Sequence, residues 1–545
     1  MKICYSKHPL NIQSNGDCLE FDINKDIDID QAREKFNDAI GQLATKLELR
    51  QYLFSRICER NILFNDMFLD FCYISLIEKL SSDHPNIEVR TNKYTIYKYF
   101  RKHKNSLTTP GSIILFQLSA LSVYFAQAPK LLKFVFKRIL FHRNIRKALG
   151  SDKKRLNLNS TTIIQTWVAD NNFTDAGFQD SYYRGLHEYL NKNNRQCVTW
   201  PVFYNVKNTK RTIQHIRKNR DSFLLFEDYL KYSDYLKPIK DSLSFNKFRI
   251  KKFVVDGKDL SGIFHYYHHM ELSMYTSLTY QFIRRLADEK FDDVIIILNH
   301  ENMVVEKATL LARNEFCPNF KVWGYFHTTK PRNQLCLEYA NYQDYKLAPK
   351  PDKIIFNSPQ FRKYYSKKYP DLVCQDGYAF KQAYIDDIHS SPGKDSNVLV
   401  FLSGSMTDSL LVIDMLNLIA DRAADIHFIF RFHPMNIFEL DKLCTLHNYS
   451  TSQEPLPALY SKVKKVVCPY SACLIEASLT GKNVAFIYNP QHLLLNPFDD
   501  TGIDNYELIT QSDNLLDFLK RQADSSPVSN IFNTDPKTLS AFLPD

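Results

Sequence analysis

The stretch Asp425–Pro490 decides the predicted fold. It begins DIHFIFRFHPMN and, after a polar interval, continues as KKVVCPYSACLIEASLTGKNVAFIYNP. The apolar run Ile426–Phe430 predicts a buried strand, and the later segment reads as strand, turn, helix, turn and strand. Strands that alternate with helices predict a parallel sheet, and ligands of such sheets bind outside the carboxyl ends of the strands.

Polar groups are predicted to meet at that edge of the sheet. Arg431 and His433 follow the first strand, and Ser471 follows the second strand at the start of a helix. The free N–H groups of a helix N-terminus favour an anion, so these groups together predict a phosphate site. The alternatives are a partly buried sheet-edge side chain for His433 and an ordinary N-cap for Ser471.

Composition and charge narrow the class of protein. The chain has 545 residues, of which 44% are hydrophobic and 24% charged, so we expect a folded protein of two or three domains. The 11 cysteines form no CxxC pair, and Met1–Leu10 has no apolar core, so we expect a reducing, cytoplasmic compartment. The formal net charge is +10, and residues 130–155 alone hold ten Lys or Arg against one Asp. A local basic block predicts one anionic surface and no nucleic-acid groove.

The chain divides into segments of different pattern. Residues 1–155 predict a mainly helical region, and residues 156–345 alternate strands and helices. The proline-bearing segment KLAPKPDK, 346–353, is interpreted as the crossing to a second alternating region at 350–522. The tail, 523–545, is expected to pack loosely. The predicted fold is therefore α/β, with two Rossmann-like, doubly wound parallel sheets and a mainly helical N-terminal extension.

A basic amphipathic segment is predicted at 112–150. The almost uncharged run Ser112–Ala128 precedes PKLLKFVFKRILFHRNIRKALG, in which Lys and Arg alternate with large apolar side chains. This pattern is typical of a helix that lies in a membrane interface against acidic headgroups. The alternatives are a buried helix pair with a solvated basic face, and a true membrane span.

Several motifs resemble those of known carbohydrate enzymes. RFHP, followed by CPYSACLIEASLTGKNVAFI, resembles the His-Pro and Ser motifs of bacterial sialyltransferases and related Kdo and capsule glycosyltransferases. TWVADNNFTDAGFQDSYYRGLHEYL, NHENMVVEKATLLA and VWGYFHTTKPRNQL with PDKIIFNSPQFRKYY are similar to bacterial surface-carbohydrate biosynthesis proteins of O-antigen type. The resemblance covers about 160–500 and implies a GT-B fold, in which the two sheets face each other across a cleft.

The resemblance also implies a function. It is transfer of a sugar from a nucleotide donor, with a CMP-activated ulosonate such as Kdo or a sialic-acid-like sugar as the best guess, to a growing lipopolysaccharide O-antigen or capsule. The nucleotide-sugar would be a co-substrate, with no cofactor and no metal. The acceptor would be a glycan or lipid-linked glycan at the inner-membrane surface. Tyr470-Ser471 stands where the family often has two adjacent hydroxyls, so UDP- or GDP-sugars remain open. The alternatives are a CDP-polyol phosphotransferase of teichoic-acid type and a non-catalytic glycan-assembly factor.

Two acids are candidates for the base that an inverting transfer needs. Glu301 directly follows the predicted strand DVIIIL, at its carboxyl end, and could accept the proton of the acceptor hydroxyl. Its alternative role is that of a first-turn acid at a helix N-terminus. Asp256, in the sequence VVDGKD, is the second candidate, because an acid before Gly is the base in sialyltransferase-like enzymes. Its alternative role is a simple turn.

Further site residues are expected along both sheet edges. His433 is also a candidate catalytic group through its contact with the leaving phosphate. On the donor side we expect Ser403, Gly404, Ser405, Glu476 and His327, and on the acceptor side Asp170, Asp175 and Glu306. The alternatives are a plain strand-to-helix turn for Ser403–Ser405, and acceptor binding or a satisfied loop histidine for His327. Glu476 could instead brace its turn. No metal is expected, because the histidines 265, 268 and 269 lack the HExxH order and a carboxylate at the needed spacing.

Overall fold

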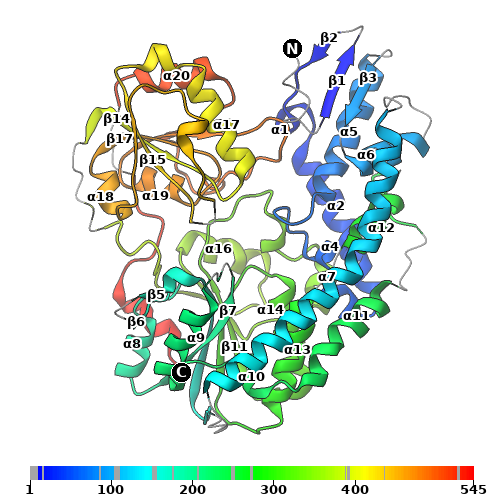
Figure 1. Cartoon of the computed structure of the whole chain (residues 1–545), viewed down its shortest axis with the longest axis vertical. Coiled ribbons are helices and arrows are strands. Elements are labelled where there is room, and N and C mark those ends of the chain that lie inside the picture. Colours follow the sequence, from blue (N-terminus) through cyan, green and yellow to red (C-terminus); the bar gives the residue numbers. More distant parts are fainter. Residues whose placement is uncertain are drawn as a thin grey trace.

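A computed structural model describes the chain apart from a set of short segments. The residues outside the description are 1–9, 15–16, 85–86, 92, 103–110, 150–155, 175–176, 205, 207, 247–251, 271–273, 387, 389–392, 435, 524–527 and 545. Figure 1 shows two α/β domains, one above the other, and an N-terminal region that lies beside both. The predicted pair of parallel sheets with a mainly helical N-terminal extension is confirmed.

The first α/β domain is built on a six-stranded sheet in which every pair is parallel. Its strand order is β13-β12-β11-β10-β4-β7. The central strand β10 is buried at every position, because helices cover both faces of a doubly wound sheet. The strands are β4 (Thr161–Val168), β7 (Gln196–Phe203), β10 (Ile295–Asn299), β11 (Lys321–Phe326), β12 (Lys353–Phe356) and β13 (Cys374–Asp376).

Helices α8 to α16 belong to this half of the chain. They are α8 (Leu186–Lys192), α9 (Thr209–Lys218), α10 (Phe226–Tyr229), α11 (Lys237–Asn246), α12 (Ser261–Met270), α13 (Met274–Ala287), α14 (Val304–Phe316), α15 (Tyr342–Leu347) and α16 (Pro359–Lys368). Two short hairpins are inserted: β5 (Phe173–Thr174) with β6 (Gly177–Phe178), and β8 (Val254–Val255) with β9 (Lys258–Asp259).

The second α/β domain repeats the plan with the strand order β16-β15-β14-β17-β18-β19, again all parallel. Its strands are β14 (Lys394–Phe401), β15 (His427–Arg431), β16 (Tyr449–Thr451), β17 (Val463–Cys468), β18 (Asn483–Ile487) and β19 (Tyr506–Ile509). Its helices are α17 (Met406–Asn417), α18 (Leu456–Tyr460), α19 (Cys473–Leu479) and α20 (Ser512–Lys520).

The N-terminal region packs helices around a small antiparallel sheet. Its strands β1 (Leu10–Ser14), β2 (Asp17–Leu19) and β3 (Ile87–Thr91) pair in the order β2-β1-β3. The helices are α1 (Ile23–Asp26), α2 (Ile29–Gly41), α3 (Leu49–Phe54), α4 (Arg56–Glu59), α5 (Met67–Asp83), α6 (Tyr94–Lys102) and α7 (Gly111–Leu149). The region also touches the second domain, where the amide of Ile23 donates to the carbonyl of Pro490 (2.8 Å).

The crossing between the two domains lies later than the sequence predicted. KLAPKPDK, 346–353, is only the connection from α15 to β12, because β12 pairs with β11 and β13 pairs with β12 inside the first sheet. The chain enters the second sheet at β14, so the crossing runs from 377 to 393. The prolines of this segment indicate a local loop. The boundary between the domains depends on which strands pair, and strand pairing joins residues that are far apart in the sequence.

The C-terminal tail returns to the first domain and does not pack loosely. The turn of 3-10 helix Pro536–Phe542 places Phe542 in the core beside Tyr325 and Phe380, at ring separations of 5.5 and 5.2 Å. Backbone bonds join Asn533 to Asn357 and to Ala379, both at 2.8 Å. The expectation of a loose tail is therefore wrong, because its Ala and Phe side chains complete an apolar cluster under the first sheet.

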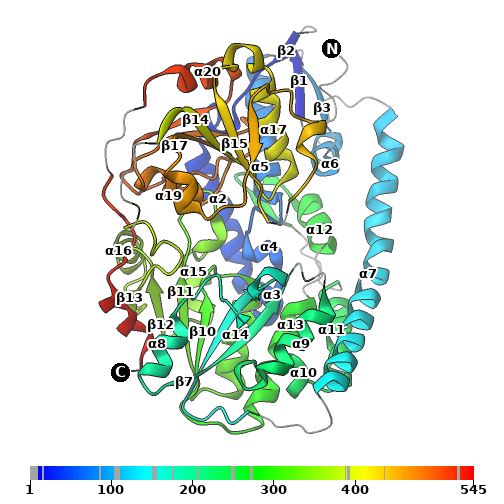
Figure 2. The same cartoon turned by 60° about the vertical axis from the view of Figure 1, so that its left-hand side comes forward.

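Helix α7 runs as one long element along the outside of the molecule (Figure 2). It has 39 residues and contains Pro129. Its later half is tied to the first domain by the ion pair Arg138–Glu227 (2.7 Å) and by the contact of His142 Nδ1 with the Tyr235 hydroxyl (2.8 Å). Within the described part of the chain, no helix has both the length and the apolar character needed to span a membrane. The side chains of residues 111–128, which include the predicted run 112–128, lie outside that description.

Candidate active site between the two sheets

Strand pairing brings two of the predicted residues together. Asn299 of β10 is paired with Tyr325 of β11, so the residues that follow these strands lie at the same sheet edge. Glu301 and His327 occupy these positions, and Glu301 Oε1 lies 3.0 Å from His327 Nε2. The Glu301 side chain is 23% exposed and that of His327 only 5%, so the pair is largely buried and the imidazole is the more deeply placed of the two.

The pKa shifts of the pair favour an ionised Glu301. Burial raises the pKa of this carboxyl, but His327 and the nearby Lys381 lower it more strongly, and the net shift is downward. Burial lowers the pKa of His327 despite the opposing effect of Glu301. At neutral pH the site therefore holds a carboxylate against a neutral imidazole, which is the state that a general base requires.

Glu306 fixes the loop that carries Glu301. Its buried carboxylate accepts the backbone N–H of Glu301 (3.0 and 3.1 Å) and that of Asn302 (2.8 Å). Asn302 has a φ of 54°, a left-handed conformation that Asn tolerates better than most residues. Burial raises the pKa of Glu306. The prediction that Glu306 contacts an acceptor is corrected, because both of its oxygens are used by the backbone of this loop.

The crossing segment contributes a lysine that the sequence analysis did not single out. Lys381 Nζ lies 4.2 Å from the ring centre of Tyr182. Burial lowers the pKa of Lys381, while Glu476 of the second domain and Glu301 of the first both raise it. The ammonium group of Lys381 therefore interacts electrostatically with carboxylates of both domains. No motif or periodicity distinguishes it in the sequence.

Glu476 braces the crossing segment from the second domain. Its carboxylate accepts hydrogen bonds from the Tyr384 hydroxyl (2.6 Å) and from Gln382 Nε2 (3.3 Å), and burial raises its pKa. The carboxylate therefore braces the crossing segment, which differs from the bracing of its own turn expected as the alternative from the sequence. At the same edge, the Tyr470 hydroxyl donates to Gln334 Oε1 of the first domain (3.2 Å), so the two sheet edges are in contact.

The donor-side residues are arranged differently from the prediction. His433 follows β15 and Ser471 follows β17, but β14 lies between these strands. Strand axes are about 4.8 Å apart, so the two tips are separated by about 10 Å and are not neighbours. The turn Ser403–Ser405 follows β14 and fills the interval. A Cβ on Gly404 would stand 3.3 Å from His433 Nδ1, so the imidazole packs closely over this glycine.

Ser471 and Arg431 occupy the two flanks of this edge. Ser471 Oγ accepts the N–H of Cys473 (3.2 Å), and α19 begins at Cys473 with Ala472 as its N-cap, so Ser471 lies one residue before the cap position. Arg431 donates to the carbonyl of Glu454. Burial raises the pKa of the Cys473 thiol to about 12, and Arg431 and Lys381 both act in the opposite direction. Both cations therefore act electrostatically on the turn that carries Ser471.

Asp256 does not belong to this site. It lies in the β8–β9 hairpin turn with a φ of 49°, followed by Gly257 at 76°. Its carboxylate is paired with Lys35 (2.9 Å) and Lys258 (3.7 Å), which hold its pKa below the usual value. The prediction of Asp256 as the second base is corrected, because a left-handed turn explains the Asp-Gly sequence.

Asp170 and Asp175 are the other acids predicted on the acceptor side. Asp170 follows β4, and its carboxylate accepts the backbone N–H of Asn208 (3.2 Å), so it is directed to the connection before α9. Asp175 lies outside the described residues. Among the described residues, no group of three or more His, Cys, Asp and Glu side chains is arranged to hold a metal ion.

Comparisons with known proteins find similar structures but no similar sequence. No family model and no curated protein matches the sequence. A UDP-GlcNAc 2-epimerase from Neisseria meningitidis, bound to UDP-GlcNAc, aligns over 70% of this chain and 98% of its own, with 13% identity and a TM-score of 0.40. MurG from Acinetobacter baumannii aligns over 66% and 88%, with 12% identity and a TM-score of 0.34. The glycosyltransferase SnogD from Streptomyces nogalater aligns over 65% and 88%, with 11% identity and a TM-score of 0.33.

Proposed function

We propose that this chain is a glycosyltransferase that moves a sugar from a nucleotide donor to an acceptor hydroxyl. The observation that carries the proposal is the Glu301–His327 pair, 3.0 Å apart at the ends of two adjacent strands, in which a buried imidazole lies against an ionised carboxylate. The second sheet has Arg431 and the hydroxyl of Ser471 at the ends of its own strands. Base and leaving-group sites on facing edges are what sugar transfer requires.

In this mechanism Glu301 accepts the proton of the attacking hydroxyl. Its lowered pKa keeps it ionised at neutral pH, and the backbone bonds from its loop to Glu306 hold it in place. His327 acts as a positioning residue, because its ring nitrogens are buried and it reaches the reaction only through Glu301. As the carboxylate takes this proton, the electron pair of the O–H bond stays on the acceptor oxygen, which attacks the sugar carbon while the nucleotide leaves.

The leaving nucleotide would bind along the edge of the second sheet. Lys381 and Arg431 act electrostatically on the Ser471 turn, and His433 packs over Gly404 of the Ser403–Ser405 turn. Cations and hydroxyls stabilise the negative charge that develops on the departing phosphate, which is the task that a metal performs in other transferases. We therefore propose that no metal and no cofactor other than the nucleotide-sugar takes part.

The finer assignment rests on the motif resemblance. RFHP and CPYSACLIEASLTGKNVAFI favour a CMP-activated ulosonate as donor and a growing bacterial surface polysaccharide as product. The direct test is incubation of the full-length protein with CMP-Kdo, CMP-sialic acid, UDP-GlcNAc, GDP-mannose and CDP-glycerol, each with cell-surface glycan as acceptor. Release of CMP from a CMP-sugar with labelled glycan supports the proposal. Transfer from CDP-glycerol, or binding of none of these nucleotides, contradicts it.

The variant His433→Ala is expected to weaken donor binding. The imidazole lies over the Gly404 turn at the proposed phosphate edge, so its loss should raise the donor KM about tenfold, the equivalent of one hydrogen bond to a charged group. Steady-state kinetics on the best donor would measure the change. His447→Ala is the matched control, because that exposed histidine pairs with Asp421 away from the site (3.1 Å). An unchanged donor KM in His433→Ala contradicts this part of the proposal.

We further propose that α7 attaches the protein peripherally to the inner membrane from the cytoplasmic side. Leu132 and Phe136 are 60% and 63% exposed, and Lys133 and Lys137 beside them are exposed as well. Large apolar side chains between lysines on one helix face favour insertion among acidic headgroups. A glycan or lipid-linked acceptor at that surface would then lie within reach of the cleft.

Leu132→Ser with Phe136→Ser should lower membrane binding at least about tenfold, because each side chain contributes about 1.5 kcal/mol or more when buried in lipid. Sedimentation with vesicles containing phosphatidylglycerol would measure the partition coefficient. The control is Leu418→Ser with Ile437→Ser, which removes two equally apolar side chains, each 71% exposed, from the second domain. Equal loss in both double variants, or none in the first, would refute membrane contact through α7.

A further inference from the structure

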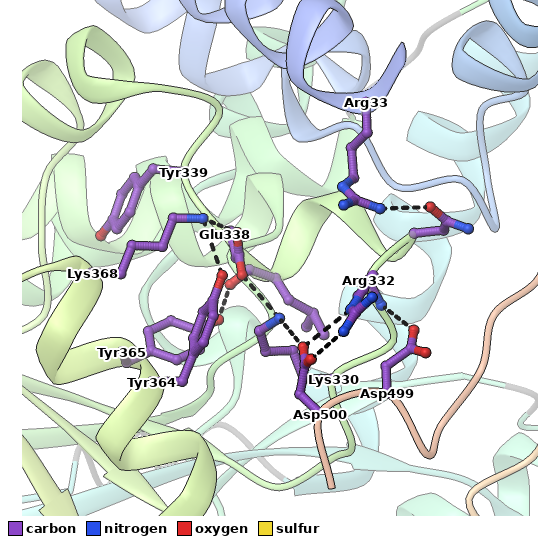
Figure 3. Close-up of polar contacts among 12 residues, drawn as sticks. Arg33, Lys330, Arg332, Glu338, Tyr339, Tyr364, Tyr365, Lys368, Asp499 and Asp500 are labelled. Atoms are coloured by element: carbon purple, nitrogen blue, oxygen red, sulfur yellow. Dashed lines mark hydrogen bonds and ion pairs between the residues drawn. The ribbon is translucent and has the colours of Figure 1, made fainter. Parts of the chain in front are cut away.

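A large cavity lies outside the proposed catalytic pair. It has a volume of about 680 Å³ and is walled by α2, the segment 330–345, α16 and the loop that carries Asp500 (Figure 3). Three separate parts of the chain therefore meet in it: the N-terminal region, the first domain and the second domain. Glu301 and His327 are not among the residues that line it. A volume of this size accommodates a small-molecule ligand.

The charged groups of the cavity wall are almost balanced. The described lining includes four Lys or Arg and five Asp or Glu side chains. Lys330 is paired with Glu338 (3.1 Å), and Arg332 with Asp500 (2.6 Å). Lys368 also contacts Glu338. Burial alone would raise the pKa of Glu338, but Lys330 and Lys368 lower it to about 2. Glu338 is therefore ionised at any physiological pH.

This balance selects the chemistry of the ligand. The described part of the wall holds no excess of positive charge, so it gives a phosphate or carboxylate group no net electrostatic attraction. A ligand with many hydroxyls can donate to the carboxylates and accept from the cations at the same time. A wall with both hydrogen-bond acceptors and donors of opposite charge thus favours an uncharged polyhydroxy compound over a nucleotide.

Tyrosines supply the apolar part of the wall. Tyr339, Tyr345, Tyr364 and Tyr369 line the cavity and are held by packing or by neighbours, as in the approach of Lys330 Nζ to the Tyr364 ring (4.0 Å). Tyr342 differs, since it lines the cavity and is nevertheless 71% exposed. An exposed aromatic ring in the wall of a polar cavity is suited to stacking on the C–H face of a sugar ring.

We propose that this cavity is a carbohydrate-binding site for an uncharged oligosaccharide, with Tyr342 as its stacking platform. Glu338, Lys330 and Arg332 would bond the hydroxyls, and α2 gives the N-terminal region a direct part in ligand binding. The site stands independently of the catalytic proposal, because its lining and its ligand are separate from the Glu301–His327 pair. Within a glycosyltransferase it would hold a part of the acceptor chain that does not react.

The test is a glycan array probed with the full-length protein, carrying uncharged and acidic oligosaccharides side by side. We expect binding to be confined to uncharged glycans. By titration with the best of them, Tyr342→Ala should weaken binding about tenfold, since one aromatic stack accounts for about 1.4 kcal/mol. Tyr342→Phe should retain it, because the ring stays. Tyr232→Ala, which removes a tyrosine that is 46% exposed and lies elsewhere, is the control and should bind as the wild type does.

Three results would overturn this inference: no glycan bound, acidic glycans preferred, or full affinity in Tyr342→Ala. Because the Tyr342 side chain is exposed, we expect Tyr342→Ala to fold, with a melting temperature that matches that of the wild type. The outcome also separates the two proposals. Glycan binding through Tyr342 in a protein that consumes no nucleotide-sugar would refute the transferase and leave the carbohydrate site standing.

Discussion

Replacement of Glu301 by Gln is expected to lower kcat for sugar transfer by about 10²–10⁴-fold, the range that a positioned general base contributes. Gln keeps the size of the side chain and can still contact His327, so the fold and the donor Kd should not change. Single-turnover assays with the preferred donor and titration of the same donor would separate the two effects. A variant with wild-type kcat would show that another group takes the proton.

The pH dependence gives a second measure of the same role. Because the net shift of the Glu301 pKa is downward, the apparent pKa of the acid limb in the pH profile of kcat/KM should lie below the ordinary range of glutamate. His327→Gln removes a group that lowers this pKa, so its acid limb should move to higher pH. Glu439→Gln, an exposed acid of the second domain, is the control and should leave the profile unchanged.

The second large effect concerns stability and the attachment of α7. Arg138→Ala is expected to lower the free energy of unfolding by about 3–5 kcal/mol, because it leaves the buried Glu227 without its cation. Arg138 Nη2 lies 2.7 Å from Glu227 Oε1, and the guanidinium also lies 5.2 Å from the ring centre of Phe141. Chemical denaturation at pH 7 would measure the loss.

Two controls distinguish a buried charge from a general loss of packing. The double variant Arg138→Met with Glu227→Gln should recover most of the stability, since no unpaired charge remains. Lys137→Ala, on the exposed side of the same helix, should change stability by no more than about 0.5 kcal/mol. Burial already raises the pKa of Glu227, and loss of Arg138 raises it further, so the deficit of Arg138→Ala should shrink as the pH falls. A deficit that is independent of pH would contradict this explanation.

The sheets could be predicted because their strands are short, apolar and flanked by turns. DVIIIL and KKVVC predict buried strands from residues next to one another, and β10 and β17 confirm them. The order of strands could not be predicted in this way, because it depends on pairs far apart in the chain. The same limit explains the misplaced domain crossing, where the prolines of KLAPKPDK marked a loop inside one sheet.

The candidate site was predicted in part for similar reasons. Glu301 and His327 were each placed at a strand end from local sequence, but their contact depends on the register of β10 against β11. Asp256 was misread because Asp-Gly is equally the sequence of a tight turn. Lys381 lies in a segment without a motif or a hydrophobic period. The cavity proposed to bind an oligosaccharide is lined by residues such as Arg33 and Asp500, which are hundreds of positions apart in the sequence.

The return of the C-terminus to the first domain has a mechanical consequence. The chain connects the two domains once through 377–393 and again on the way to Phe542, which is anchored beside Tyr325. These two links, together with the N-terminal region that contacts both domains, oppose twisting of one half against the other. Truncation before Pro536 would remove the anchor of Phe542 and weaken one of these links.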